Sequence, residues 1–470
     1  MVLMMLLALS AGASAADYYI SSRSGDDARS GLSESQAWRT LGRLKSVRLN
    51  GGDRVLLERG GLWRETLKAQ SGSPGAPVTY TSYGRGDKPL IQPSVEKSKE
   101  TDWCEIEPGL WASPIKGKDV GLIVFNYGEK WGFKKFWDNP EATWERPWGG
   151  GYDRKRLVGI KNDLDFMHEP LKERVVVKSA ENPARRFKSV ELLVAKHGVD
   201  ESGCHDVVYD GLAVRYAGCH GFGGGSTRNI IIRNCDISWI GGALQFWAKD
   251  KKTGKTMYPV RFGNGIEFWG NCASNLVERC RIWEIYDAAL TNQGMKDSET
   301  DIVWRDNVIW NSEYSFEYWN GKYTRNVVFE HNTCVNAGGG WGNAQRPDPN
   351  GAHLMFYAHP CEQHSVVVRD NLFVNATQWS ARIGLDWRDE LTIDGNLFWN
   401  DDAKVPYCRW LEGAPMTKLD YAGVRDLGFQ RSGFNLKPDF VDAARRDYRL
   451  AEGSAGKGAA TDGTDLGARQ

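Results

Sequence analysis

The hydrophobic and polar positions between residues 229 and 401 follow one pattern that is repeated six times. Each repeat has an alternating run rich in β-branched residues, then a polar turn, then a second short apolar run. The repeats are NIIIRNCDISWI from Asn229, NLVERCRIWEI from Asn275, DIVWRDNVIWNS from Asp301, NVVFEHNTCVNA from Asn326, SVVVRDNLFVNA from Ser365 and LTIDGNLFWND from Leu391. Alternation with a period of two residues is typical of β-strands, so each repeat predicts two short strands joined by a turn.

Two columns run through the aligned repeats. The turn column holds Cys235, Cys280, Asn307, Asn332, Asn371 and Asn396. Two residues later, an apolar column holds Ile237, Ile282, Ile309, Cys334, Phe373 and Phe398. Spacings of 25 and 27 residues in the turn column match one coil of a parallel β-helix, and those of 39 and 45 match a coil with an inserted loop. We therefore predict stacked coils with an asparagine ladder and a continuous core row, which a β-sandwich would not produce.

The N-terminal part carries motifs that identify a fold family. SSRSGDDARSG, QAWRTL, GGDRVLLERGGLWRETL and PVTYTSYG resemble the opening of secreted pectate-lyase-like β-helix proteins. With the six coils, the resemblance covers most of Tyr18 to Asp401. It implies an all-β, right-handed parallel β-helix. That superfamily includes polysaccharide lyases, glycoside hydrolases, uronate epimerases and phage tailspikes, so the resemblance implies a carbohydrate-related role without choosing the chemistry.

The order of the segments predicts five regions. Residues 1–16 are apolar and end in a small-residue cleavage signal, typical of a signal peptide, so we expect a secreted or periplasmic product. Residues 17–91 are expected to form an N-terminal cap and the first coils, and 92–200, rich in Trp, a β-rich insertion. Residues 201–401 form the coils that carry the candidate site, and 402–470 the C-terminal strands and cap. No later segment approaches the about 20 apolar residues of a membrane span.

Composition narrows the class of partner. The chain has 60 Lys and Arg against 60 Asp and Glu, which argues against nucleic acid, because duplex binding needs a basic excess. Its nine Cys form no CxxC pair, so a zinc site is not expected, and their odd number leaves at least one thiol unpaired or paired between chains. Twenty Trp suit the recognition of sugar rings. We expect a carbohydrate polymer or oligosaccharide as partner, without a prediction of oligomeric state.

The strands that precede the turn column predict one polar outward face. Glu267, Asn292 and Glu317 follow one another at 25 residues, and His220 precedes Cys235 by the same 15 residues that separate Asn292 from Asn307. We therefore predict a row of His220, Glu267, Asn292 and Glu317, edged by Trp269 and Trp319. Because strand side chains alternate, a register error of one residue would put Thr291 in place of Asn292.

This row favours glycoside hydrolysis without a cofactor. Two Glu two coils apart have backbones about 9.5 Å from each other, and carboxyl groups about 6.5–9.5 Å apart suit an inverting acid–base pair. The predicted catalytic residues are Glu267, Glu317, Asp287 and His220. The predicted substrate-binding residues are Trp269, Asn292, Gln293, Trp319, Trp341, Arg346, His353, Tyr357 and Arg382.

Two alternatives remain open. As a polysaccharide lyase or uronate epimerase, the chain would hold Ca²⁺ with Glu267, Asn292 and Glu317. The resemblance implies that a Lys, Arg, His or Tyr would then remove the C5 proton, with the candidates His353, His359, Tyr357, Arg346 and Arg382. As a non-catalytic glycan-binding β-helix, the chain would use the same face for binding only. The row of Glu and Asn is also compatible with an ordinary solvated surface. Expected loops at 248–264 and 340–352, at the same edge, favour function.

Overall fold

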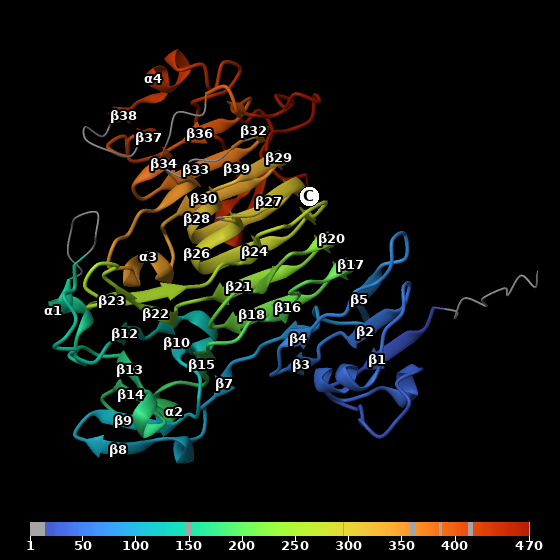
Figure 1. The fold of residues 1–470 in the computed structure, drawn as a ribbon, viewed down its shortest axis with the longest axis vertical. Coiled ribbons are helices and arrows are strands. Elements are labelled where there is room, and N and C mark those ends of the chain that lie inside the picture. Colours follow the sequence, from blue (N-terminus) through green and yellow to red (C-terminus); the bar gives the residue numbers. More distant parts are fainter. Residues whose placement is uncertain are drawn as a thin grey trace, which may run out of the picture.

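The computed structural model describes residues 15–145, 153–294, 296–357, 362–363, 365–384, 388–411 and 417–469. Its main body is a stack of coils, and the strands of each coil pair in parallel with those of the next coil (Figure 1). The prediction of an all-β parallel β-helix is confirmed. Almost all of the expected signal peptide lies outside the described residues. Within the described ranges, the helices are too short and too polar to cross a membrane.

Three parallel faces make up each coil. The first is a ten-stranded sheet of β1 (Asp17–Ile20), β2 (Arg54–Glu58), β5 (Val78–Tyr83), β17 (His205–Asp210), β20 (Arg228–Arg233), β25 (Leu276–Glu278), β27 (Ser298–Arg305), β29 (Tyr323–Glu330), β32 (Val366–Arg369) and β35 (Leu391–Asp394). The second contains β3 (Leu62–Trp63), β6 (Leu90–Ile91), β18 (Ala213–Ala217), β21 (Asp236–Ile240), the first halves of β26 (Arg281–Gly294) and β28 (Val308–Asn320), β30 (Thr333–Ala337), β33 (Leu372–Ala376) and β36 (Leu397–Trp399).

The third face carries the candidate site. It contains β4 (Leu67–Lys68), β16 (Val199–Asp200), β19 (Phe222–Gly225), β24 (Ile266–Trp269), the second halves of β26 and β28, β31 (Ala352–Phe356), β34 (Trp379–Ile383) and β37 (Cys408–Trp410). The antiparallel β38 (Thr417–Leu419) ends it. Strands β26 and β28 are long because each bends from the second face to the third without an intervening turn.

The asparagine ladder is confirmed. The backbone N–H of Asn307 donates to the Asn332 Oδ1 at 3.0 Å, that of Asn332 donates to Asn371 at 2.8 Å, and that of Asn371 donates to Asn396 at 3.1 Å. All four side chains are fully buried. Gln430, which the sequence pattern did not reveal, extends the ladder by accepting from the Asn396 N–H. The ladder supplies partners for turn N–H groups that would otherwise be buried without one.

The core row is also confirmed. Backbone pairing aligns Ile237, Ile282, Ile309, Cys334, Phe373 and Phe398 in successive coils, and all six are at most 1% exposed. Toward one end, the row becomes an aromatic stack in which the rings of Phe373 and Phe398 lie 4.5 Å apart. Burying each such ring contributes roughly 1.5–3 kcal/mol.

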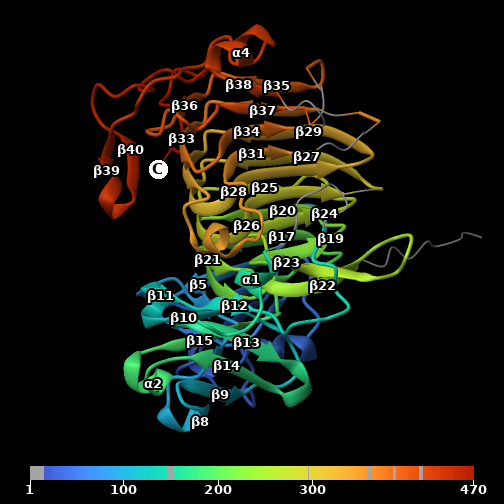
Figure 2. The same ribbon diagram turned by 90° about the vertical axis from the view of Figure 1, so that its left-hand side faces the viewer.

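An inserted body with its own core occupies most of residues 92–200 (Figure 2). One of its sheets has β7 (Val95–Glu96), β10 (Val120–Phe125), β11 (Lys130–Trp131) and β15 (Val190–Val194). The other has β8 (Cys104–Glu107), β9 (Leu110–Pro114), β12 (Phe133–Lys135), β13 (Asp165–Glu169) and β14 (Arg174–Lys178). Two single-turn helices, α1 (Arg154–Leu157) and α2 (Pro183–Arg186), complete the body. The chain rejoins the β-helix at Val199, where β16 pairs with β4.

Two further segments interrupt the coils beside the third face. The first is a hairpin of β22 (Ala243–Lys249) and β23 (Thr256–Phe262), which begins five residues before the expected loop at 248. The second contains α3 (Trp341–Gln345), which packs against β26 and β28 (Figure 1). The inserted body packs on Tyr216 of β18 and Trp239 of β21, which are strands of the second face.

Both ends of the stack are covered. At the first end, Trp38 joins the main core together with Leu41 and Leu44 of the short helix η2 (Leu41–Ser46). At the other end, Val424 of α4 (Tyr421–Asp426) and Phe429 join it. Covering the terminal strands protects unpaired edges from pairing with other chains.

The last described residues run back along the stack. After the hairpin of β39 (Phe440–Asp442) and β40 (Asp447–Leu450), the segment 461–469 bonds to residues of three successive coils. Its contacts are Thr461 to Asp370, Ala468 to Thr333, and Arg469 to Asp306.

Two tryptophans pack on the outside of the second face. Trp283 and Trp310 stack at 4.8 Å with their planes 5° apart, and Tyr448 of β40 contacts Trp310. Eight cysteines are described, of which seven are buried and none forms a disulfide with another described residue.

A carboxyl group buried in the core predicts a pH-dependent stability. Glu201 is fully buried, and this burial raises the pKa of its carboxyl from 4.5 to about 8 although the Tyr209 hydroxyl lowers it. The folded protein is therefore stabilised by the proton below about pH 4.5, and this contribution is lost as the pH rises toward 8. We expect Glu201→Gln to stabilise the fold by on the order of 2–4 kcal/mol at pH 8.5 and by little at pH 4.5, measured by thermal unfolding at both pH values. Equal effects at both would contradict this.

Candidate active site

One outward row on the third face brings two predicted carboxyl groups together. Backbone pairing places Gly223, Glu267, Thr291, Glu317, Met355 and Arg382 in neighbouring strands at the same level. Glu267 and Glu317 are thus two strands apart, with backbones about 9.5 Å from each other. The small side chain of Thr291 lies between them and donates to the Glu317 Oε2 at 3.0 Å.

The prediction that Asn292 belongs to this row is wrong. Asn292 pairs with Phe268 and Tyr318, whose side chains belong to the main core. Its Oδ1 accepts from the Trp304 indole at 2.8 Å, and its Nδ2 donates to the buried Glu299 at 2.7 Å. Because strand side chains alternate, a shift of one residue turned the amide inward and put Thr291 outside.

Glu317 is the most perturbed acid of the row. Its Oε2 accepts from Gln293 Nε2 at 2.6 Å as well as from Thr291, and the Tyr357 hydroxyl also hydrogen-bonds it. Burial, reinforced by the negative charge of Asp287, raises the pKa of Glu317 to about 8. The carboxyl therefore holds its proton at neutral pH, although three donors partly stabilise the anion.

Asp287 reaches the row through a bulge. Between Ile285 and Ala288, β26 advances by three residues while β28 advances by two, from Ser312 to Tyr314. The extra residue redirects the chain, and such bulges are frequent beside active sites. The Arg346 guanidinium, from the segment after α3, bonds the Asp287 Oδ1 at 3.0 Å. Burial raises the pKa of Asp287, and the Arg346 guanidinium opposes this shift by stabilising the carboxylate.

Sequence reasoning missed Glu313, which is the second carboxyl at Arg346. It lies 3.6 Å from the Arg346 Nε and accepts from the Asn343 side chain at 2.9 Å. Burial raises the pKa of Glu313 to about 7. Glu313 lies on β28 where the strand bends between faces, and no repeat column marks that bend, so the sequence carried no signal for it.

Glu267 lies between two polar partners. Its Oε2 accepts from Asn264 Nδ2 at 2.7 Å, and its Oε1 lies 3.3 Å from the His220 Nε2. The His220 Nδ1 accepts from the Asn264 backbone N–H, so the single proton of the neutral ring is on Nε2 and faces Glu267. Burial lowers the pKa of His220 to about 3 and raises that of Glu267 to about 7.

A second histidine, also missed from the sequence, supports His220. The rings of His197 and His220 stack at 5.1 Å, and burial together with the His220 charge lowers the pKa of His197 to about 4. His197 lies in the segment between β15 and β16, outside the repeats. Gly223, which has no side chain, lies against the His197 ring. A Cβ at this position would come within 2.7 Å of the ring, so a larger residue would displace it.

Aromatic side chains border the carboxyl groups. Trp269, 41% exposed, meets Trp319 edge-on at 6.4 Å, and Trp319 contacts Tyr357 at 5.7 Å. Gln293 lies between the two tryptophans in the backbone register. Indole faces and edges beside polar groups suit sugar rings, which present C–H groups and hydroxyls together.

Several predicted binding residues lie elsewhere. Trp341 is fully buried and its indole donates to the Glu284 carbonyl, so it cannot offer a surface for sugar. His353 is also buried, with its Nδ1 3.0 Å from the Ser315 hydroxyl and its ring against Phe373 in the core. Arg382 stays in the outward row, two strands beyond Glu317. His359 lies outside the described residues.

The residues expected to hold Ca²⁺ do not form such a site. The Asn292 amide points into the core and already bonds Trp304 and Glu299. Thr291 and Gln293 both donate to the Glu317 Oε2, whereas Ca²⁺ requires several carboxylate or carbonyl oxygens free to bind it. No group of three or more metal-ligating His, Cys, Asp or Glu occurs in the part of the chain that the structure describes.

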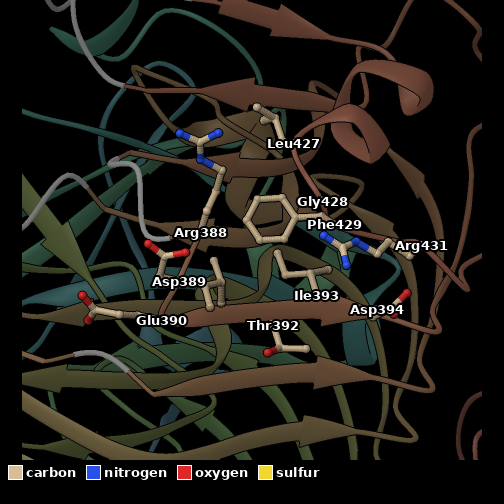
Figure 3. Close-up of a pocket in the computed structure, with 11 residues that line it drawn as sticks. Arg388, Asp389, Glu390, Thr392, Ile393, Asp394, Leu427, Gly428, Phe429 and Arg431 are labelled. Atoms are coloured by element: carbon tan, nitrogen blue, oxygen red, sulfur yellow. The ribbon is translucent and has the colours of Figure 1, made fainter.

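A cavity of about 640 Å³ lies away from this row, at the end of the first face (Figure 3). Arg388, Asp389 and Glu390 line it as exposed side chains, together with Phe429. The row of Glu267 and Glu317, where buried carboxyl groups lie beside the exposed Trp269, is the better candidate for catalysis.

The comparisons with known proteins give short or distant similarities. No family model matches the chain. A lacto-N-biosidase of Bifidobacterium longum subsp. longum is 40% identical over 81 residues, which are 16% of this chain and 5% of that protein. The chain thus aligns with only a small part of that relative's length.

The similar solved structures carry names of carbohydrate-active enzymes. A GH136 lacto-N-biosidase from Eubacterium ramulus is 14% identical, with 90% of this chain and 67% of that chain covered and a TM-score of 0.37. Pectate lyase Pel9A is 12% identical, with 97% and 96% covered and a TM-score of 0.45. A glycoside hydrolase is 10% identical, with 82% and 83% covered and a TM-score of 0.48. These values do not assign the chain to a family.

Proposed function

We propose that the chain is an enzyme that hydrolyses glycosidic bonds of a polysaccharide or oligosaccharide. One observation carries this proposal: the buried carboxyl groups of Glu267 and Glu317 and the half-buried one of Asp287 share one outward surface bordered by the exposed Trp269. Acids with raised pKa values are concentrated at sites of proton transfer. The apolar N-terminal residues further suggest export, which would bring the enzyme to extracellular glycans.

Glu317 is proposed as the general acid. Because burial and Asp287 raise its pKa to about 8, the carboxyl carries a proton at neutral pH. It would pass this proton to the glycosidic oxygen as the bond from that oxygen to the anomeric carbon breaks. The leaving sugar then departs as a neutral alcohol.

Asp287 is proposed as the general base. The Arg346 guanidinium bonds its Oδ1 and opposes the rise of its pKa, and so stabilises the carboxylate form that a base requires. Two acids whose environments separate their pKa values are suited to opposite roles. Asp287 would accept a proton from a water molecule whose oxygen forms the new bond to the anomeric carbon.

Glu267 is the second candidate base. Its separation from Glu317 by two strands fits the about 6.5–9.5 Å between the carboxyl groups of inverting enzymes. Asn264 and the His220 Nε2–H stabilise its anion, and its pKa of about 7 leaves it partly ionised at neutral pH.

The mass of the products tests the reaction class. We expect wild-type protein, incubated with a panel of neutral and acidic glycans, to give products whose summed mass exceeds the substrate by one water. A lyase would instead give unsaturated uronates that absorb in the ultraviolet and add no water, which would overturn the proposal. Tight binding without any product would favour a non-catalytic glycan-binding protein.

A further inference from the structure

A second cavity, about 200 Å³ in volume, lies between the inserted body and the β22–β23 hairpin. Its walls include Asp119, Lys134, Phe136, Trp137, His168 and Leu244. Asp119 directly precedes β10, Lys134 lies on β12, and His168 lies on β13, all in the inserted body. Leu244 lies on β22, so the cavity forms where the inserted body meets the hairpin. None of them belongs to the carboxyl row.

The polar groups of this cavity form a connected set. The Lys134 ammonium contacts the Asp119 carboxylate and donates to the Val120 carbonyl at 2.7 Å. The same carboxylate accepts from the Leu244 N–H at 2.6 Å and from the His168 Nδ1, which lies 3.3 Å away. Asp119 therefore fixes both the lysine and the imidazole.

Two polar atoms remain for a ligand. With its proton on Nδ1, His168 presents Nε2 as an acceptor, and this buried atom has no hydrogen-bond partner among the described residues. The Lys134 ammonium has three donors, of which Asp119 and Val120 use two. A sugar hydroxyl can donate to one such atom and accept from the other.

The remaining walls are aromatic. Trp137 is 40% exposed and packs against Trp247 at 5.3 Å, which leaves part of its indole for a ligand. Phe136 lies on the same strand end, with Lys134 5.6 Å from its ring. An indole beside a few fixed polar atoms is a common design for sugar binding.

The charges of the walls favour a neutral ligand. Lys134 is paired with Asp119, and the adjacent Lys135 lies 3.4 Å from Asp165. Both cations therefore already have carboxylate partners. A carboxylate ligand would add an uncompensated buried charge, which is costly, whereas neutral hydroxyls are not.

The cavity is linked to the carboxyl row on both sides. Phe262, paired with Ala243 next to Leu244, contacts the His220 ring at 5.2 Å. On the other side, the Lys134 N–H donates to Gln345, the residue before Arg346, which bonds Asp287. These contacts join the walls of the cavity to residues of the carboxyl row.

We propose that this cavity is a binding site for one neutral sugar ring of the same glycan, with His168 Nε2 and Lys134 Nζ binding its hydroxyls and Trp137 its apolar face. The link to one glycan rests on the proposed function. A neutral substrate also agrees with hydrolysis, because a lyase requires a uronate next to the cleaved bond.

The test is calorimetric titration of the Glu317→Gln variant with methyl glycosides of glucose, galactose, xylose and N-acetylglucosamine, and with methyl glucuronide. We expect one or more neutral glycosides to bind, and Trp137→Ala in the same background to weaken that binding about tenfold. Trp137→Phe should retain most of the affinity. Trp131→Ala is the matched control, because Trp131 lies in the same body at 37% exposure but outside the cavity, and it should bind like the parent.

Unchanged affinity in Trp137→Ala, tighter binding of the glucuronide, or no binding of any glycoside would each overturn the inference. Failure of the proposed function is seen separately. If wild-type protein hydrolyses no glycan while binding still depends on Trp137, the sugar site stands and the enzyme proposal falls.

Discussion

Replacing Glu317 with Gln is expected to lower kcat about a thousandfold, because the amide cannot donate the proton that the leaving oxygen needs. The variant should fold normally. Gln is close in shape to the protonated carboxyl, and its carbonyl can still accept from Thr291 and Gln293. The measurements are kcat on a cleaved glycan and the unfolding temperature. Activity equal to wild type would contradict the assignment.

Substrates with different leaving groups distinguish a general acid from a residue that only positions other side chains. An aryl glycoside with a good leaving group needs little protonation, so Glu317→Gln should lose far less activity on it. Asp287→Asn should lose activity on both substrates alike, since water activation is needed in each. If Glu267→Gln shows that behaviour and Asp287→Asn does not, Glu267 is the base.

Glu299→Gln is the matched control for these variants. Glu299 is also fully buried, and burial raises its pKa to about 7, but its carboxyl faces the core, where Asn292 and Asn320 donate to it. Its replacement should leave kcat within a few-fold of wild type. A thousandfold loss here would show that any buried carboxyl change disturbs catalysis.

Asn332→Ala is expected to destabilise the fold by roughly 3–5 kcal/mol, since it removes a buried side chain and leaves buried polar groups unpaired. Asn332 accepts from the Asn307 N–H and side chain, and donates to Asn371 and to the Trp304 carbonyl. The measurement is the free energy of unfolding from denaturant titration.

Asn400→Ala provides the comparison. Asn400 is half-buried and donates to the Ala376 carbonyl at 2.9 Å, but lies outside the ladder. Its replacement should cost about 1 kcal/mol or less. A similar small loss in Asn332→Ala would mean that the ladder contributes little to stability.

Most of the fold could be predicted from the sequence repeat. Columns of Asn and Phe were readable because each coil occupies the same chemical environment as its neighbours, and stacking repeats that environment. The outward face was readable for the same reason, which placed Glu267 and Glu317 in one row correctly.

The features of the site that could not be predicted from the sequence lie where the repeat is interrupted. Strand pairing joins Glu267 to Thr291 over 24 residues and Thr291 to Glu317 over 26, so the equal spacing of 25 that predicted Asn292 is wrong by one residue. Arg346 and Glu313 meet only through the segment after α3, where no column exists. Trp341 was expected to bind sugar, yet it packs that segment onto Tyr286.

The segment 461–469 has a consequence for the acid of the site. In a stack of coils, each coil contacts only its neighbours, so the end coils can open separately while the rest stays folded. Arg469 pairs with Asp306, which directly precedes Asn307 and the strand that carries Glu317, while Thr461 bonds Asp370 nearer the end. Opening of the last coils is therefore coupled to the coil of Glu317, and the geometry around its proton depends on contacts made on the opposite side of the β-helix.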